Sequence, residues 1–220
     1  MMTKKTQSQE FTRDQYNAIP AWSNSRLGQI KRILQGYAAE SKKSGALTFG
    51  IAFHESILES HKFDPTAYAL TGTQKNMLLA MQEAVFNTPD LAHAIHTGEH
   101  EKIFRWTDRV THQPCKLRLD THLQDETIID FKTTSANTLA EFNDHFYRFE
   151  YDRQAAMYLK GTGARTILFA GVQKRIHHPQ IFIHEVHRNS QTDRTGSQKF
   201  RFLIRKAVTG GFPYIIKDYV

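Results

Sequence analysis

The sequence Cys115-Lys-Leu-Arg-Leu-Asp120, followed after a polar break by Thr127-Ile-Ile-Asp-Phe-Lys-Thr-Thr134, predicts two β-strands. In the first stretch, Leu117 and Leu119 alternate with polar neighbours, and the second stretch opens with a β-branched run. The polar residues from Gln124 to Glu126 are expected to form the turn between them. We therefore expect the two stretches to pair as a hairpin.

Three charged side chains converge if this hairpin forms. In a strand, Asp130 and Lys132 point to the same face, and Asp120 would lie on the neighbouring strand. Two carboxylates repel each other unless a cation lies between them, and a hard divalent ion with oxygen ligands is the usual solution. Protonated Lys132 cannot be a ligand, so it can face a phosphate or an activated water. This set suits metal-assisted phosphodiester hydrolysis, although the same pattern is more often a solvated face of a hairpin.

The segment before the hairpin adds a third strand and a further acid. From Glu101 to Asp108 the sequence alternates, and residues 109–114 are expected to make the turn into the strand that begins at Cys115. Glu101 would then begin a strand antiparallel to the one that carries Asp120. Glu99 is a neighbouring alternative for the same role.

A helix expected over residues 47–59 carries His54 on or beside its apolar face. A single histidine in such a position is more often a satisfied core residue than a metal ligand. The segment alone does not decide between these two interpretations.

Two further helices contribute polar side chains. Gln154 and Tyr158 are four residues apart in the helix that follows Tyr151, so they share one face. Ser23 or Asn24 can cap a helix that continues to Leu34. Its free backbone amides and nearby basic side chain suit an anion, and the ordinary alternative is a surface helix without a ligand.

The order of the predicted elements is helices, three strands, helices, two strands and a final helix, which predicts an α/β fold with a mixed sheet flanked by helices. The last two strands are expected over residues 165–172 and 180–187, and the final helix over residues 190–208. A chain of 220 residues is most simply one domain. Residues 1–14 are polar and are expected to form a flexible N-terminal tail, which leaves residues 15–220 as the domain.

The composition favours a polyanion as partner and excludes several classes of site. The net charge is +7 and the sequence pI is about 9.5. Cys115 is the single cysteine, which excludes a disulfide framework, a thiolate zinc site and a four-cysteine iron–sulfur cluster. The mean hydropathy is −0.53, no apolar run approaches the roughly 18 residues of a membrane span, and the first residues lack the apolar segment of a signal peptide. A reducing cytoplasm is the expected location.

Five motifs, in the expected order between about Trp22 and Tyr158, resemble those of the PD-(D/E)xK nuclease superfamily. Within it they are most similar to the RecE-like (exonuclease VIII-like) DNA exonucleases of phages and prophages. The motifs are Trp22-Ser-Asn-Ser-Arg-Leu27, Gly50-Ile-Ala-Phe-His-Glu-Ser-Ile-Leu-Glu59, Glu101 to Trp106 with Cys115 to Asp120, Ile129-Asp-Phe-Lys-Thr-Thr134, and Gln154-Ala-Ala-Met-Tyr158. Each is weak alone. The chain departs from the family pattern at Ile51, His112 and Leu119. These departures affect packing and turn geometry, and none of them changes a proposed ligand.

The resemblance implies a restriction-endonuclease-like fold and a role for each matched residue. Asp120, Asp130, His54 and the main-chain carbonyl of Phe131 would hold Mg²⁺ or Mn²⁺, so His54 becomes a ligand. Glu101 would be a second-ion or water-mediated ligand, and Lys132 would orient the attacking water or stabilise charge on the phosphate. The residues expected to bind substrate are Ser23, Ser25, Arg26, Gln154 and Tyr158.

The resemblance also implies an activity and partners. The chain would be a metal-dependent exonuclease that resects the ends of linear double-stranded DNA to give single strands for recombination. A single-strand annealing protein is a candidate partner, and a homo-oligomeric ring is expected, with the apolar tail from Phe212 to Val220 as a possible interface. The alternatives are a structure-specific endonuclease or nickase on the same fold, and a non-catalytic DNA-binding module. A small-molecule hydrolase that uses a His/Asp pair has little support, because the sequence has no Gly-x-Ser-x-Gly motif.

Overall fold

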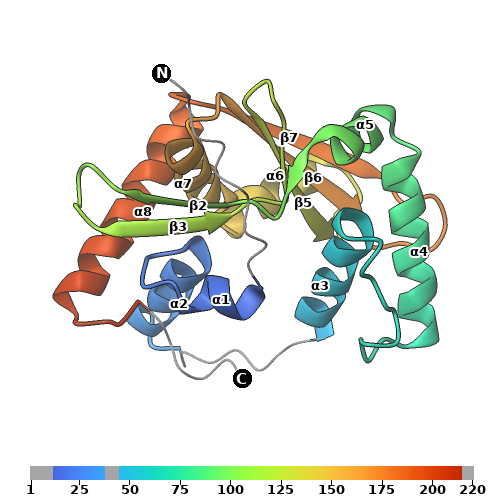
Figure 1. The fold of residues 1–220 in the computed structure, drawn as a ribbon, viewed down its shortest axis with the longest axis horizontal. Coiled ribbons are helices and arrows are strands. Elements are labelled where there is room, and N and C mark those ends of the chain that lie inside the picture. Colours follow the sequence, from blue (N-terminus) through green and yellow to red (C-terminus); the bar gives the residue numbers. More distant parts are fainter. Residues whose placement is uncertain (1–11, 38–44, 215–220) are drawn as a thin grey trace, which may run out of the picture.

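The computed structural model describes residues 12–37 and 45–214, which form layers around a five-stranded sheet with the strand order β1-β4-β5-β6-β7 (Figure 1). The strands are β1 Glu99–His100, β4 Thr121–His122, β5 Thr127–Thr134, β6 Thr166–Gln173 and β7 Ile181–His187. β5 and β6 are parallel, and the other neighbours are antiparallel. The predicted α/β fold with a mixed sheet flanked by helices is confirmed.

The predicted pairing of the two opening stretches is wrong. The first stretch forms β3 (Pro114–Arg118), which pairs with β2 (Ile103–Thr107) in a separate two-stranded sheet. The other edge of β3 is occupied by Trp22, whose N–H donates to the Pro114 carbonyl at 2.9 Å and whose carbonyl accepts from the Lys116 N–H at 2.9 Å. Both edges of β3 are therefore occupied. On the edge of β5 that does not pair with β6, only the two residues of β4 form strand pairs.

Helices cover both faces of the five-stranded sheet. α3 (Gly45–Leu58), α4 (Gly72–Phe86) and α5 (Pro89–Thr97) pack against Ile129 and Phe131 of β5. α6 (Leu139–Arg148) and α7 (Tyr151–Thr162) pack on the opposite face, with Ile128, Ile167 and Phe169. Because strand side chains alternate, Asp130 and Lys132 point with Ile128 toward α7.

The remaining helices complete the side of the molecule beyond α7. α2 (Asn24–Leu34) and α8 (Gln191–Thr209) pack with α7 around Leu27, Met157 and Phe200. α1 (Arg13–Ala18) begins within the N-terminal segment that was expected to be flexible. Thr12 and Gln15 form a capping box at its start, and the Lys116 ammonium donates to three carbonyls at its end. These acceptors are the carbonyls of Tyr16, Asn17 and Ile19.

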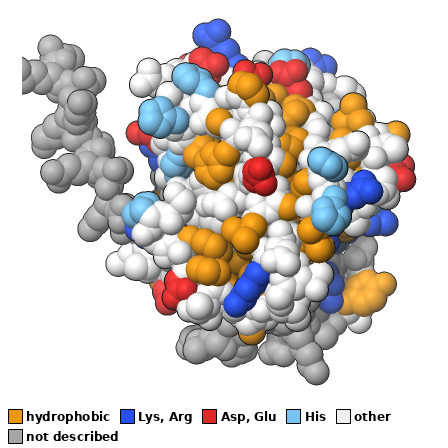
Figure 2. Space-filling model, turned by 90° about the vertical axis from the view of Figure 1, so that its right-hand side faces the viewer, with side chains coloured by type: hydrophobic (Ala, Val, Ile, Leu, Met, Phe, Trp, Pro, Cys, Tyr) orange, Lys and Arg blue, Asp and Glu red, His pale blue; other side chains and the backbone are white. Residues whose placement is uncertain are grey.

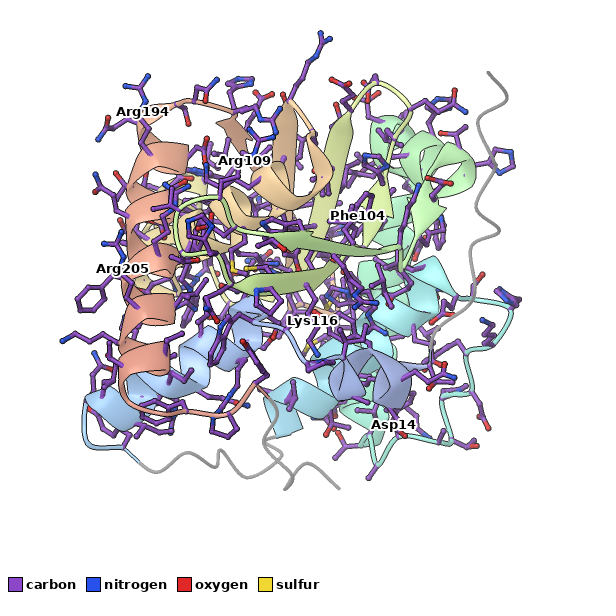
Figure 3. All side chains as sticks on the ribbon, turned by 60° about the vertical axis from the view of Figure 1, so that its left-hand side comes forward. Asp14, Phe104, Arg109, Lys116, Arg194 and Arg205 are labelled. Atoms are coloured by element: carbon purple, nitrogen blue, oxygen red, sulfur yellow. The ribbon has the colours of Figure 1, made fainter. Side chains whose placement is uncertain are left out.

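Exposed Lys and Arg side chains are distributed differently on the side that carries α4 and on the side that carries α8. On the face that carries α4, Lys and Arg cover only small separate areas between hydrophobic and polar side chains (Figure 2). On the side that carries α8, Arg194, Arg205 and Arg109 are exposed (Figure 3). Within residues 12–37 and 45–214, no helix has the length and apolar character needed to cross a membrane.

The thiol of Cys115 is expected to be unreactive in the folded protein. Its side chain is 1% exposed, and burial raises the pKa of the thiol to about 12, with the Asp108 carboxylate adding to the rise. Since the thiolate is the reactive form, a disulfide reagent at pH 8 is expected to leave the native thiol unmodified over minutes and to modify it fully in guanidinium chloride. Rapid stoichiometric labelling of the native protein would contradict the packing of β3.

Candidate active site

Asp120 lies at an open edge of β5, in the two-residue crossing between β3 and β4. β4 covers only Ile128 and Ile129 on that edge of β5. Beyond these two residues the Asp120 side chain provides the hydrogen bond that a neighbouring strand would make, because its Oδ2 accepts from the Phe131 N–H at 2.8 Å. The N–H and C=O groups of one strand residue lie on the same edge, so the Phe131 carbonyl faces the side on which Asp120 lies.

His54 reaches the same edge from α3. Its Nδ1 lies 3.2 Å from Asp120 Oδ2, and its side chain is 28% exposed, so it is not part of the apolar core. Burial acts to lower the pKa of His54, but the Asp120 carboxylate raises it above its ordinary value overall. Burial acts in turn to raise the pKa of Asp120, and the His54 charge and hydrogen bond lower it below its ordinary value. The pair is therefore stabilised in its ionised form.

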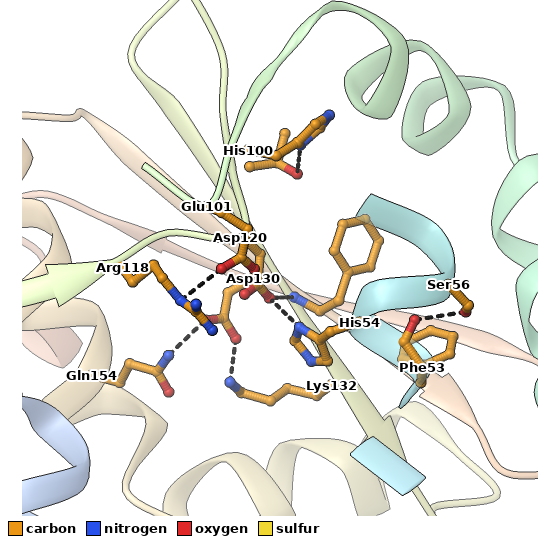
Figure 4. Close-up of polar contacts among 12 residues, drawn as sticks. Phe53, His54, Ser56, His100, Glu101, Arg118, Asp120, Asp130, Lys132 and Gln154 are labelled. Carbon is orange, nitrogen blue, oxygen red and sulfur yellow. Dashed lines mark hydrogen bonds and ion pairs between the residues drawn. The ribbon is translucent and has the colours of Figure 1, made fainter. Parts of the chain in front are cut away.

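Asp130 is held from two sides on the face of β5 that points to α7 (Figure 4). The side-chain amide of Gln154 donates to Asp130 Oδ1 at 2.6 Å, and the Lys132 ammonium forms an ion pair with Oδ2. Asp130 is 2% exposed. Burial raises its pKa to about 6, although the charge of Lys132 opposes the rise and the Asp120 carboxylate adds to it. The predicted common face of Asp130 and Lys132 is confirmed by this ion pair.

Glu101 lies next to Asp120, but it does not begin a strand as expected. It falls between β1 and β2 with φ of 53°, a left-handed conformation, and its N–H donates to the Asp120 carbonyl at 3.3 Å. Arg118 Nε lies 2.6 Å from Glu101 Oε2. Burial raises the pKa of Glu101 to about 7, while the guanidinium of Arg118 opposes the rise. The alternative, Glu99, is mostly exposed and pairs with Lys102.

Arg118 and Tyr151 belong to this group, although the sequence analysis assigned neither of them a role. Arg118 forms an ion pair with Glu101. The sequence pattern that could have indicated Arg118 is its alternation with buried Leu117. The Tyr151 ring centroid lies 4.9 Å from Lys132 Nζ, and Tyr151 comes from the first turn of α7. No sequence pattern distinguished this tyrosine from the other aromatic residues nearby.

The residues expected to bind substrate are placed differently from one another. Ser23 caps α2 by accepting from the Arg26 N–H at 3.2 Å, and Ser25 is exposed in the first helical turn. Arg26 is buried, and its guanidinium donates to the Pro213 carbonyl at 2.9 and 2.8 Å. Tyr158 donates to the Arg118 carbonyl at 3.2 Å. Gln154 and Tyr158 therefore reach the group around Asp130, whereas Arg26 contacts the C-terminal segment.

The donor atoms of the site are turned toward protein partners. Among the residues that the structure describes, no group of three or more His, Cys, Asp or Glu side chains is arranged to hold a metal ion. Lys132 and His54 instead balance the charges of Asp130 and Asp120. Asp130 Oδ2 and Glu101 Oε2 are buried and have ion-pair partners, but no hydrogen bond of good geometry. These two oxygens therefore have remaining capacity for a cation.

Comparison with solved structures supports the fold. A protein from Eubacterium rectale with the name "Putative exonuclease" has a TM-score of 0.65 at 15% sequence identity, covering 92% of this chain and 88% of that chain. At this identity the similarity shows a shared fold. The alkaline exonuclease LHK-Exo from Laribacter hongkongensis has a TM-score of 0.46 at 14% identity, covering 90% and 93% of the two chains. A phage-related exonuclease from Haemophilus somnus has a TM-score of 0.41 at 12% identity, covering 71% and 82%.

Comparison with sequences gives the family. No curated protein matches this sequence. The family model described as a PDDEXK-like domain of unknown function (DUF3799) matches residues 28–193, which contain the two aspartates, Lys132, His54 and Gln154. This match confirms the predicted PD-(D/E)xK resemblance. It covers about three quarters of the 220 residues, and the chain therefore belongs to this PDDEXK-like family.

Proposed function

We propose that this chain is a divalent-metal-dependent DNA exonuclease that acts on the ends of linear double-stranded DNA. The observation that carries the proposal is the convergence of His54 and Asp120, at the open edge of β5, with Asp130 and Lys132 on the adjoining face. The Eubacterium rectale protein that shares the fold has the word exonuclease in its name, which makes this the first activity to test. The net charge of +7 suits a polyanionic substrate.

The donor set fits Mg²⁺ or Mn²⁺. Asp120, Asp130, His54 and the Phe131 carbonyl would hold the ion, with Glu101 as a second-ion or water-mediated ligand. Carboxylate and carbonyl oxygens are the ligands that these hard cations prefer. The buried Asp130 oxygen without a good hydrogen bond supports this fit. When bound, the metal supplies a Lewis acid for the phosphate and lowers the pKa of its water.

The chain's own residues would then position and stabilise the reacting groups. Lys132 provides a fixed positive charge beside the phosphate, a preorganised contribution worth about 3 kcal/mol. Gln154 holds the Asp130 carboxylate through its 2.6 Å hydrogen bond, and Arg118 holds Glu101 at 2.6 Å. Tyr158 would brace the strand that carries Arg118. Ser23, Ser25 and Arg26 stay candidates for a terminal phosphate, which requires Arg26 to leave the Pro213 carbonyl.

The wider proposal concerns the product and the assembly. A single domain over residues 15–220 that resects duplex ends would leave single strands for recombination, so a single-strand annealing protein is the proposed partner. We propose a homo-oligomeric ring and a cytoplasmic location. The predicted interface includes residues 215–220, which lie outside the described residues.

Digestion of end-labelled linear duplex beside a covalently closed circle tests the activity. With Mg²⁺, the protein is expected to degrade the linear duplex completely and to leave the circle intact, and EDTA is expected to stop the reaction. The position of the label, at the 5′ or the 3′ end, gives the polarity. Nicking or linearisation of the circle would instead assign an endonuclease on the same fold.

One observation favours a non-catalytic DNA-binding module as the second candidate. No preformed group of three metal-binding side chains occurs among the described residues. Lys132 pairs with Asp130, and His54 pairs with Asp120. Calorimetric titration with Mn²⁺ separates the two candidates. A nuclease is expected to bind the ion in wild-type protein, whereas DNA binding without either Mn²⁺ binding or degradation would assign the module.

A further inference from the structure

A pocket lies at the C-terminal end of β5, beyond Lys132 and on the side of α6. The residues that line it are Thr133, Thr134, Ser135, Phe142, His145, Phe149, Tyr151 and Lys174. Tyr151 connects it to the candidate active site, because the ring that lines the pocket lies 4.9 Å from Lys132 Nζ. Two residues of a strand span about 6.5 Å, so the hydroxyls of the pocket follow closely after Lys132.

The size of the pocket suits one planar group. The space open to the centres of water molecules is about 100 Å³, which is several times the space that one water needs. The pocket is partly open to solvent, so a group attached to a longer chain can enter it. A single ring of an extended strand fits these limits better than a compact, fully enclosed ligand.

One wall of the pocket is aromatic. The rings of His145 and Phe149 have centroids 5.6 Å apart, and those of Phe149 and Tyr151 are 5.8 Å apart. Phe149 is 51% exposed, although exposing a large aromatic ring to water is unfavourable. A nucleobase can stack on such rings whatever its sequence, because every base has a π-face.

The rest of the lining suits a phosphate. Lys174 is exposed and lines the pocket together with Ser135. Its backbone N–H donates to the Thr134 carbonyl at 2.8 Å, which fixes its backbone at the end of β5. Thr134 Oγ1 lies 3.2 Å from His145 Nδ1, so the imidazole is also held. None of the described residues that line the pocket is Asp or Glu. The charge of the lining is therefore positive.

From these observations we infer that the pocket binds one nucleotide of the DNA strand, next to the reacting phosphate. The base stacks on the wall of Phe149 and Tyr151, and Lys174 with the Ser135 hydroxyl holds the nucleotide's phosphate. This choice of ligand rests on the proposed function. It adds a second contact region, outside the proposed metal site, that keeps the strand aligned with Lys132.

Binding of thymidine 5′-monophosphate in EDTA, followed by ligand-observed NMR, tests the pocket without metal and without catalysis. The wild-type protein is expected to bind this probe, and to bind 2-deoxyribose 5-phosphate more weakly because the base is missing. Phe149→Ala is expected to lower the affinity for the nucleotide about 5-fold or more, which is the effect of losing one stacked base. Lys174→Ala is expected to lower it as well, through loss of the phosphate contact.

Two matched variants serve as controls. Tyr147→Ala removes an equally exposed aromatic ring two residues before Phe149, outside the pocket. Arg175→Ala removes the exposed cation next to Lys174. Both are expected to bind like wild type. Absence of nucleotide binding by wild type, or equal losses in the control variants, would overturn the inference.

Parallel digestion of linear duplex with Mg²⁺ separates this inference from the proposed function. Degradation of DNA with unchanged nucleotide binding in Phe149→Ala and Lys174→Ala means that the pocket inference fails alone. Nucleotide binding that depends on both residues, without degradation under any divalent ion, means that the nuclease proposal fails and the pocket stands.

Discussion

Asp130→Asn is expected to lower the rate of Mg²⁺-dependent degradation of linear duplex by about 1,000-fold or more. Removal of one preorganised electrostatic contact costs about 100- to 1,000-fold, and this change also removes the charge of a proposed metal ligand. The asparagine has the same shape and can still accept the hydrogen bond from Gln154. The variant is therefore expected to fold, and the loss should appear in activity and in Mn²⁺ affinity.

The control is the same substitution at Asp125, in the turn before β5. Asp125 is exposed, and its Oδ1 accepts from the Thr127 N–H at 3.0 Å, which an asparagine can also do. Asp125→Asn is expected to degrade linear duplex at the wild-type rate. Residual activity above one tenth of wild type in Asp130→Asn, with matching circular dichroism, would contradict the role of Asp130.

Gly196→Ala is expected to lower the free energy of unfolding by about 3 kcal/mol, the upper part of the usual range for overpacking. α8 crosses α7 at Gly196, where an added Cβ would lie 2.0 Å from the Asp152 carbonyl oxygen and 3.0 Å from the Ala156 Cβ. The near neighbour is backbone, so it cannot rotate away. A loss of this size corresponds to a fall in Tm of roughly 6–12 °C for a chain of this length.

Gly50→Ala is the matched control for this prediction. Gly50 lies within α3, and an added Cβ meets nothing within 4 Å among the described residues. Alanine is favoured over glycine in a helix by about 0.5–1 kcal/mol, so this variant is expected to be slightly more stable than wild type. Equal Tm values for wild type and Gly196→Ala in thermal unfolding would show that the α7–α8 contact is looser than described.

Local patterns in the sequence were sufficient to predict one half of the site. Alternation along β5 places Asp130 and Lys132 on one face, and four-residue spacing in α7 places Gln154 and Tyr158 on another. Both relations depend on the geometry of a single element. The start of α2 was predictable for the same reason, as Ser23 shows, because a cap needs only its own first turn.

The other half depends on contacts between distant segments. The pairing of β3 with Trp22 across more than 90 residues decides that β3 does not pair with β5, and no periodicity in β3 records this. The alternation predicted Arg118 only as a polar position of a strand. Its ion pair with Glu101 depends on the connection between β1 and β2, where Glu101 has a left-handed conformation. The pocket is likewise formed by residues from β5, α6 and the segment after β6.

The carboxylate of Asp120 has a second consequence, for self-association. An unpaired strand edge can recruit another chain, and an inward-pointing charge is one device that prevents this. Where β4 stops, Asp120 occupies the backbone N–H of Phe131 that an incoming strand would need. Replacement of Asp120 thus removes a guard against intermolecular strand pairing, and the mass of such a variant in solution must be measured before its loss of activity is assigned to chemistry.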